Sequence, residues 1–186
     1  MSTVLYIVSV ETYIEVMLCV VAGEPMVDEI DFYFRKEEYG WLSNFERAPQ
    51  IIGSVRCATN EHWYQHMKAR DSDMRKWILN APKPHAAMTA GRGLREHEVD
   101  PGWDDDRRVH IMLIGLRAKF HQNPELKQKL LDTGDAILHE DSPTDMFWGK
   151  KGKDMLGKLL MQVREEIRSG SSFDSGSPEL DVYEAI

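Results

Sequence analysis

The sequence is poor in cysteine, with Cys19 and Cys57 as its only two among 186 residues. Two cysteines cannot build the disulfide framework of a small secreted domain, so a reducing cytoplasm is the expected compartment. Neither belongs to a Cys-x-x-Cys pair or another activating context. We therefore expect no thiol nucleophile.

The sequence also lacks a long apolar segment. Residues 16–22 are apolar, but this run is far shorter than the roughly 20 residues that a membrane-spanning helix needs. Glu11 and Glu15 precede it, where a signal peptide would carry lysine or arginine. We therefore expect neither a signal peptide nor a transmembrane helix, and no membrane partner.

Positive charge is scarce as well: 23 lysine and arginine residues face 31 aspartate and glutamate residues, for a net charge of -8. Binding to a nucleic-acid backbone regardless of sequence requires a basic surface, so strong general nucleic-acid binding is not expected. A local cationic pocket for a nucleotide is still compatible with this composition. Hydrophobic residues make up 42% of the chain, which is ordinary for one globular domain of this length.

Complete nucleotide-binding fingerprints are missing too. Gly91-Arg92-Gly93 begins like a dinucleotide motif, but Glu96 stands where the third glycine belongs and no strand precedes it. Residues 149–153, GKKGK, lack the Walker A spacing. This loop still offers positive charge and backbone N–H groups to a phosphate, with a solvated basic turn as the alternative. No cofactor is expected.

A metal site is not expected either. His62 and His66 have the i, i+4 spacing that can hold zinc on a helix. However, Glu61 precedes the first histidine, whereas in zincins a glutamate follows it, and no third ligand with suitable spacing is apparent. We expect both histidines to be structural or to lie beside a ligand.

The chain does contain an unusual helix, ATNEHWYQHMKA, that begins at Thr59 or Asn60, both good N-cap residues. At about 100° per residue, Glu61, Gln65 and Lys68 fall on one narrow stripe. A core helix would normally place apolar residues on such a stripe. We therefore expect this face to line something polar, although a solvated charged face is the alternative.

Periodicity and turn residues predict an α+β fold, dominated by helices, with a small β-sheet. Ser72 and Asp154 are the expected caps of two helices. The expected central core helix carries an apolar stripe of Val109, Met112, Leu113, Leu116 and Phe120. The strands are expected at 30–34, 50–53, 55–57 and 136–139, and the other helices at 72–80, 85–92, 104–121, 125–131 and 154–167.

The two ends of the chain fall outside this pattern. Residues 1–25 contain two β-favouring runs that would form an added hairpin, unless the protein begins at Met26. Residues 169–186 are rich in serine and glycine and then acidic, which predicts a mostly disordered tail. One domain is expected at 26–168.

Asp145 and Trp148 lie in the predicted loop beside the Gly/Lys turn. Together with Glu61 they supply two carboxylates and an indole that can stack on a ring, a set suited to cleaving an N-glycosidic bond. Such a bond breaks through an oxocarbenium-like transition state, which one carboxylate stabilises while another activates water. A lysine can assist by pairing with charge, or by forming a Schiff base if its pKa is depressed.

Several short motifs occur in the order and spacing of one family, and over roughly residues 30–168 the chain resembles the YbiA-like family, also called NADAR domains. The resemblance implies the fold of that family. The motifs are DFY at 31–33, YGWLSNF at 39–45, TNEHWYQHMK at 59–68, GR at 91–92, Trp103, LRAKF at 116–120, DMFWG at 145–149 and LGKLLMQVR at 156–164.

The resemblance implies hydrolysis of N-glycosides of phosphorylated ribosyl substrates. Two substrate classes are associated with the family: early phosphoribosylamino-pyrimidine intermediates of riboflavin synthesis, and ADP-ribose attached to guanine in nucleic acid. By position, the catalytic residues would be Glu61, Lys68 and Asp145, and the ligand contacts Asn44, Gln65, Arg92, Trp148 and Gly149. Lys151, in the Gly/Lys loop, is expected to hold phosphate together with Arg92.

Asp154 departs from the family, which commonly has asparagine there. Its charge would either weaken a phosphate contact or make a better helix cap. The first outcome favours an alternative function, a non-catalytic module that binds ADP-ribose or a related nucleotide. A purely structural or interaction domain is a third reading. The sequence leaves open which ribosyl substrate is used, and whether Glu61 or Lys68 does the covalent or acid–base work.

Overall fold

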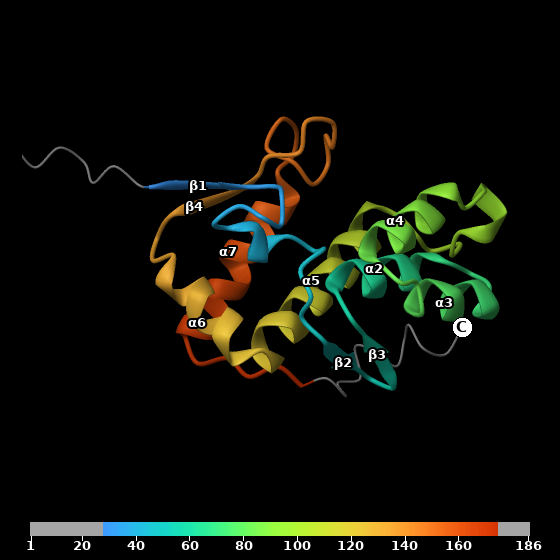
Figure 1. Ribbon diagram of the computed structural model, residues 1–186, viewed down its shortest axis with the longest axis horizontal. Helices are drawn as coiled ribbons and strands as arrows, with labels where there is room; N and C mark the ends of the chain where they lie inside the picture. The colour runs from blue at the N-terminus through green and yellow to red at the C-terminus, as the bar shows by residue number, and fades with distance from the viewer. Residues whose placement is uncertain (1–27, 175–186) are drawn as a thin grey trace, which may run out of the picture.

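The strands form two separate pairs in the computed structural model, which describes residues 28–174. β1 (Glu29–Phe32) pairs in parallel with β4 (Ile137–Glu140), although the two lie far apart in the sequence (Figure 1). β2 (Gln50–Ile52) and β3 (Val55–Cys57) form an antiparallel hairpin, whose turn contains Gly53 at a φ of 56°. The predicted α+β class is confirmed, with the small sheet divided in two.

The predicted helices are present, and the ends of most differ by one residue from the expected ends. Two short 3-10 helices, η1 (Gly40–Leu42) and η2 (Glu96–Glu98), were not predicted. The α-helices of the described chain are α2 (Asn60–Lys68), α3 (Ser72–Leu79), α4 (Pro84–Gly93), α5 (Asp105–Gln122), α6 (Pro124–Asp132) and α7 (Met155–Arg168).

One predicted helix cap is wrong, and the other holds the predicted N-cap position without a side-chain cap bond. Asp71, not Ser72, caps α3, because its carboxylate accepts hydrogen bonds from the backbone N–H groups two and three residues further on. Asp154 precedes α7 in a left-handed conformation, with a φ of 50°, and makes no side-chain cap bond. Its carboxylate is instead bonded to Nδ1 of His139 at 2.5 Å and to the N–H of Glu140 at 3.4 Å.

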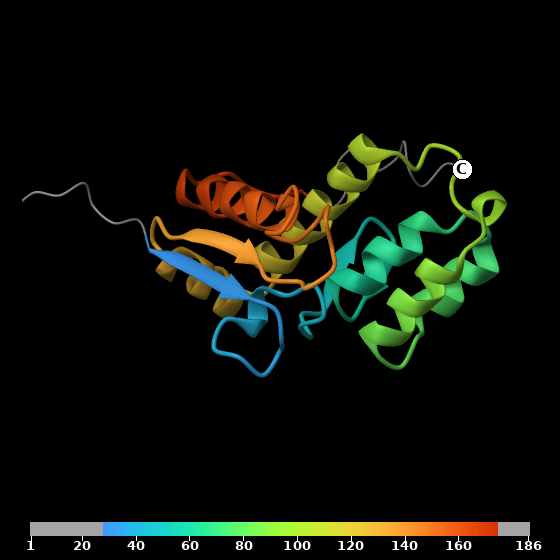
Figure 2. The same ribbon diagram turned by 90° about the horizontal axis from the view of Figure 1, so that it is seen from above.

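α5 is the central helix, as predicted. It contacts α2, α6, α7 and β2, and it runs between the β1–β4 pair and the group formed by α2, α3 and α4 (Figures 1 and 2). Because elements pack on several of its sides, burial extends beyond the predicted stripe to Ile111, Ile114 and Lys119. The core of the molecule is therefore built around this helix.

Lys119 is completely buried in α5. Its Nζ donates hydrogen bonds to the carbonyl oxygens of Trp41, Leu42 and Ser43 at 2.8, 3.2 and 2.9 Å. Burial lowers the pKa of Lys119 to about 7, whereas the three carbonyl acceptors favour the protonated form. The ammonium group thereby fixes the loop that leads to Asn44, which lies against α2.

Of the first residues of the predicted tail, 169–174, only Phe173 packs against the domain, and the others are exposed. The ring of Phe173 lies 6.0 Å from that of His121, between centroids, and contacts the core. The expectations for residues 1–25 and for 175–186 fall outside the described part of the chain and stay predictions. Within residues 28–174, no helix has both the length and the apolar character needed to cross a membrane.

We expect Lys119→Met to lower the free energy of unfolding by about 2–4 kcal/mol, because it removes the ammonium donor from the carbonyl groups of Trp41 and Leu42. The carbonyl group of Ser43 still accepts from the N–H of Glu46. Lys129→Met is the matched control, since Lys129 is exposed on α6 and should change stability by less than about 0.5 kcal/mol. Urea denaturation at pH 7 measures both. Equal stability of the two variants would contradict the structural role of Lys119.

Candidate active site

The start of α2 is fixed by the loop that Lys119 holds. Thr59 caps the helix, with its side chain accepting from the N–H of His62. The N–H of Glu61 donates to the carbonyl oxygen of Asn44 at 3.0 Å, and the Asn60 amide donates to Oδ1 of Asn44 at 2.9 Å. Asn44, predicted as a ligand contact, is buried and anchors α2 here.

Both histidines of α2 are bonded to carbonyl groups of neighbouring segments. Nε2 of His62 lies 3.0 Å from the carbonyl oxygen of Ala81, and Nδ1 of His66 lies 3.2 Å from that of Arg75. These bonds give both rings the structural role expected for them. In the part of the chain that the structure covers, no cluster of three or more His, Cys, Asp or Glu residues is arranged to hold a metal ion.

Glu61 is a buried carboxyl group, only 6% exposed. Its Oε1 accepts a hydrogen bond from Nε2 of Gln65 at 2.8 Å. Burial raises the pKa of Glu61 to about 7, and the nearby charge of Asp145 also raises it, while Gln65, Arg92 and Lys68 lower it. At neutral pH this carboxyl group is therefore populated in both protonation states, as suits an acid–base catalyst.

Lys68 and Arg92 supply positive charge beside this carboxyl group. Nζ of Lys68 donates to the carbonyl oxygen of Gly91 on α4 at 2.8 Å. Burial lowers the pKa of Lys68, as do the neighbouring charges of Arg92 and Arg108. Arg92 is exposed in the last turn of α4, which packs against α2. The predicted stripe of α2 thus faces a group of cations and not open solvent.

The loop after β4 brings Asp145 and Trp148 to α2 from the far end of the chain. Oδ1 of Asp145 accepts from the N–H groups of Phe147 and Trp148 at 3.0 and 2.8 Å, which fixes the turn. The Trp148 ring meets the ring of Tyr64 edge to face, with centroids 5.7 Å apart. Since Tyr64 follows Glu61 on α2, the structure brings both predicted carboxylates and the indole into one region.

Gly149 lies where this loop passes closest to β4. A Cβ atom on residue 149 would lie 2.6 Å from the carbonyl oxygen of Asp145 and 2.9 Å from Oε2 of Glu140. The absence of a side chain therefore allows the turn to close over Glu140. This is a packing role, and the predicted contact of Gly149 with a ligand stays a prediction.

The Gly/Lys loop is engaged in contacts within the protein. Lys150 pairs with Asp31 and Asp141 at 2.6 and 3.1 Å, and Lys153 pairs with Asp105 at 3.1 Å. The first N–H groups of α7 donate to carbonyl oxygens of residues 147 and 148 at 3.2 Å, so they are not open to a phosphate. The sequence pattern did not reveal that the preceding turn would satisfy them.

Lys151 borders a hollow of about 620 Å³ that also carries acidic and aromatic side chains, among them Asp31, Asp141 and Tyr39. These carboxylates do not favour a phosphate at that position. The phosphate-binding role of Lys151 therefore stays a prediction.

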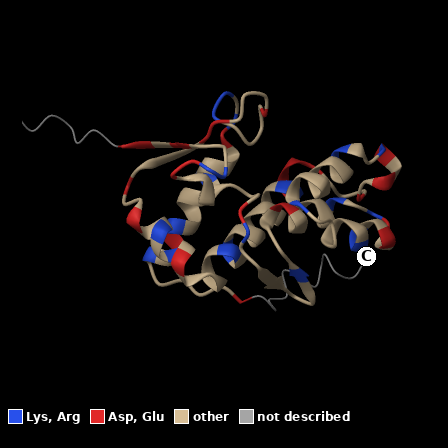
Figure 3. Cartoon of the chain, in the orientation of Figure 1, with Lys and Arg blue, Asp and Glu red and all other residues tan. Residues whose placement is uncertain are grey.

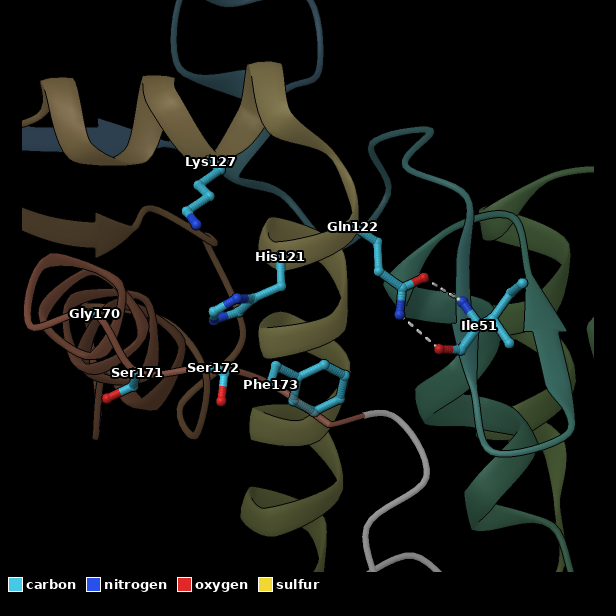
Figure 4. Close-up of a pocket in the computed structure, with 8 residues that line it drawn as sticks. All are labelled: Ile51, His121, Gln122, Lys127, Gly170, Ser171, Ser172 and Phe173. Atoms are coloured by element: carbon cyan, nitrogen blue, oxygen red, sulfur yellow. Dashed lines mark hydrogen bonds between the residues drawn. The ribbon is translucent and has the colours of Figure 1, made fainter.

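A second hollow, of about 590 Å³, lies at the C-terminal end of α5 (Figure 4). Its wall is fixed by Gln122, whose amide bonds to both the N–H and the carbonyl oxygen of Ile51 at 2.8 and 2.7 Å. The other lining residues include His121, Lys127 and Phe173, and none of the predicted site residues lines it. Over the described ribbon, basic and acidic residues are interspersed (Figure 3).

The model of the NADAR domain family matches residues 32–168 of this chain. The chain belongs to the NADAR family. The N-glycosidase YbiA of Escherichia coli K12 is 36% identical over 142 residues, which cover 74% of this chain and 88% of YbiA. An N-glycosidase of Nostoc punctiforme is 38% identical over 147 residues, covering 75% of this chain and 93% of that protein.

Other relatives agree with this assignment. A riboflavin biosynthesis protein of Vibrio vulnificus is 32% identical over 167 residues, which cover 87% of this chain but 45% of that protein. The solution structure of E. coli YbiA superposes with a TM-score of 0.71 at 34% identity, covering 81% of this chain and 91% of that chain. The predicted family, its fold and the enzyme class, an N-glycosidase, are thereby confirmed.

Three residues of this NADAR site had no role in the sequence-based prediction. Tyr64 joins the Trp148 loop to Trp103, with ring centroids 5.2 Å apart, and the guanidinium carbon of Arg108 lies 3.4 Å from the ring centroid of Phe147. Burial raises the pKa of Tyr64. Tyr64 lies within the TNEHWYQHMK motif, so it could have been found, whereas Arg108 carries no local signal.

The third residue without a predicted role is Glu140, at the end of β4. Burial raises the pKa of Glu140 to about 7, and the nearby charges of Asp145 and Asp154 add to this effect. Its Oε2 is buried and has no hydrogen-bond partner among the described residues. The Trp148 loop therefore closes over a carboxyl group whose pKa is well above its ordinary value.

We expect Asp145→Asn and Asp145→Ala to differ, because only the first keeps an oxygen that can accept from residues 147 and 148. Asp145→Asn removes the charge that raises the pKa of Glu61, so this pKa should fall while the turn is preserved. Asp145→Ala should in addition displace Trp148. Carboxyl ¹³C NMR and tryptophan fluorescence measure these effects, and identical behaviour of the two variants would contradict the dual role of Asp145.

Proposed function

We propose that the protein hydrolyses the N-glycosidic bond of a phosphorylated ribosyl substrate, with Glu61 as the principal acid–base group. The observation that carries this proposal is the setting of Glu61, a buried carboxyl group with a pKa of about 7 beside Lys68 and Arg92. The names of the relatives support it, since two are N-glycosidases and one is a riboflavin biosynthesis protein.

The reaction exchanges the C1′–N bond for a C1′–O bond. As the bond to nitrogen breaks, positive charge develops on the ribose, and the carboxylates of Glu61 and Asp145 stabilise it. Water adds its oxygen to C1′, and its proton passes to Glu61 and then to the leaving nitrogen. A pKa near 7 suits a group that both accepts and returns this proton. In this scheme water is the only co-reactant.

In this proposal, the substrate is bound by Lys68, Trp148 and Arg92. Trp148 is half-buried at the edge of the site and stacks on the base or the sugar. Arg92, exposed at the end of α4, pairs with phosphate, together with Lys151 if the substrate extends that far. The lowered pKa of Lys68 suits pairing with developing charge, and it also suits a Schiff base with the opened sugar.

Two substrate classes fit this chemistry: early phosphoribosylamino-pyrimidine intermediates of riboflavin synthesis and ADP-ribose attached to guanine in nucleic acid. Both present a ribosyl N-glycoside and a phosphate. The cations Arg92 and Lys68 fit a compact anion, and the net charge of -8 does not favour long contact with a nucleic-acid backbone. This difference favours the riboflavin intermediates.

The alternative, a non-catalytic ADP-ribose-binding module, loses the sequence feature that favoured it. The carboxylate of Asp154 is bonded to His139 and Glu140 and makes no side-chain cap bond to α7, which supports a structural role for its charge. Calorimetry with ADP-ribose remains the direct test, because tight binding without product formation would favour the module.

We expect Glu61→Gln to lower kcat at pH 7 by at least about 100-fold, because the amide cannot carry the proton. The full chain is incubated separately with the riboflavin intermediates and with DNA carrying ADP-ribosylated guanine, and released ribose phosphate or ADP-ribose is measured. Glu125→Gln, at an exposed position of α6, is the control and should retain activity. Full activity of Glu61→Gln, or no turnover of either substrate by the unaltered protein, would overturn the proposal.

We also expect Glu61→Gln to make the protein more stable at pH 8 than the unaltered chain, by about 1–3 kcal/mol. The pKa of Glu61 is about 7 in the folded protein and near its usual value of 4.5 when unfolded, so ionisation weakens folding as pH rises between these values. Because glutamine does not ionise, the variant does not lose this stability. Urea denaturation at pH 5 and pH 8 measures the effect, and a gain that is equal at both values would refute the burial of the carboxylate.

A further inference from the structure

Gly91 lies in α4 where two side chains of the predicted catalytic stripe of α2 converge. Its carbonyl oxygen accepts a hydrogen bond from Nζ of Lys68 at 2.8 Å. A Cβ atom on residue 91 would lie 1.8 Å from Oε1 and 2.6 Å from Cδ of Gln65. The space that a side chain would fill at this position is therefore occupied by the Gln65 amide.

The Gln65 amide is itself tightly enclosed, with only 5% of the residue exposed. Its Nε2 donates to Oε1 of Glu61 at 2.8 Å, whereas its own Oε1 is buried without a hydrogen-bond partner among the described residues. An amide nitrogen facing Glu61 favours the carboxylate, whereas an amide oxygen there would favour the protonated acid. The position and orientation of the Gln65 amide therefore affect the pKa of Glu61.

We propose that Gly91 is a positioning residue for the glycosidase reaction, because its lack of a side chain seats the Gln65 amide on Glu61 and its carbonyl group holds Lys68. This inference rests on the proposed function, in which Glu61 carries the reacting proton. The two neighbouring residues thus have different roles. Gly91 fixes the side chains of Gln65 and Lys68 on α2, and Arg92 supplies the charge that pairs with the substrate phosphate.

The charged and titratable groups around Glu61 come from α2 itself, from α4 and α5, and from the loop after β4. Gly91→Ala alters none of these charges. It displaces only the Gln65 amide and the hydrogen bond from Lys68 to the carbonyl oxygen of residue 91. Because the Gln65 bond lowers the pKa of Glu61, its loss should raise that pKa. The groups concerned are Tyr64 and Lys68 on α2, Arg92 on α4, Arg108 on α5 and Asp145 in the loop after β4.

The experiment compares Gly91→Ala with Gly93→Ala in the full chain. Both positions lie in α4, where alanine favours the helix, but a Cβ atom at position 93 meets nothing within 4 Å. Gly91→Ala should raise the midpoint of the Glu61 carboxyl titration, measured by ¹³C NMR, by about one pH unit, and lower kcat/KM at pH 7 by about 10-fold or more. Gly93→Ala should match the unaltered protein in both measurements.

A second comparison separates positioning from a general loss of structure. In a Gln65→Ala background the amide is gone, so adding Gly91→Ala should change the Glu61 midpoint little, and the two effects should not add. Additive effects would overturn the inference, as would an active Gly91→Ala variant with an unaltered Glu61 midpoint and rate. An unaltered chain without any glycosidase activity would instead overturn the proposed function, while the Glu61 midpoint would still report on Gly91.

Discussion

The three hydrogen bonds from the buried ammonium of Lys119 to the loop at Trp41, Leu42 and Ser43 support the arrangement of the site. They fix the main chain just before Asn44, whose carbonyl group accepts the N–H of Glu61 and whose side chain holds Asn60. The depth of Glu61 below the surface is thus set through a series of main-chain contacts that begins in the central helix. Since an unsatisfied buried carbonyl group is costly, this series has few alternatives.

The electrostatics of the site are decided by burial more than by charge. Lys68 and Arg92 both favour the carboxylate of Glu61, yet its pKa rises to about 7, because removal from water outweighs their attraction. Burial is also the largest effect on Glu140, beneath the Trp148 loop, where the neighbouring acidic charges add to it. Two buried carboxyl groups with raised pKa values weaken folding as the pH rises above their ordinary values, and such a cost is typical of sites shaped by function rather than by stability.

Much of the fold could be predicted from the sequence, because helix periodicity, prolines and turn glycines act locally, and the motifs identified the family. The lack of a side-chain cap bond from Asp154 could not be predicted. Its carboxylate is bonded to His139 on β4, a contact that depends on the tertiary fold and not on neighbouring residues. The burial of Lys119 could not be predicted either, since a lysine beside an apolar stripe usually lies at the surface. The gathering of α2 and the Trp148 loop in one region was predicted from family motifs, whereas the role of Gly91 required coordinates.

The parallel pairing of β1 with β4 ties the beginning of the domain to a strand made about 100 residues later. On the ribosome, at about 5–20 residues per second, β1 emerges several seconds before its partner exists. During that interval the hydrogen-bonding edge of β1 lacks the strand with which it pairs. The domain is therefore completed from the C-terminal side, and a nascent chain that stops before residue 137 cannot place β1 at all.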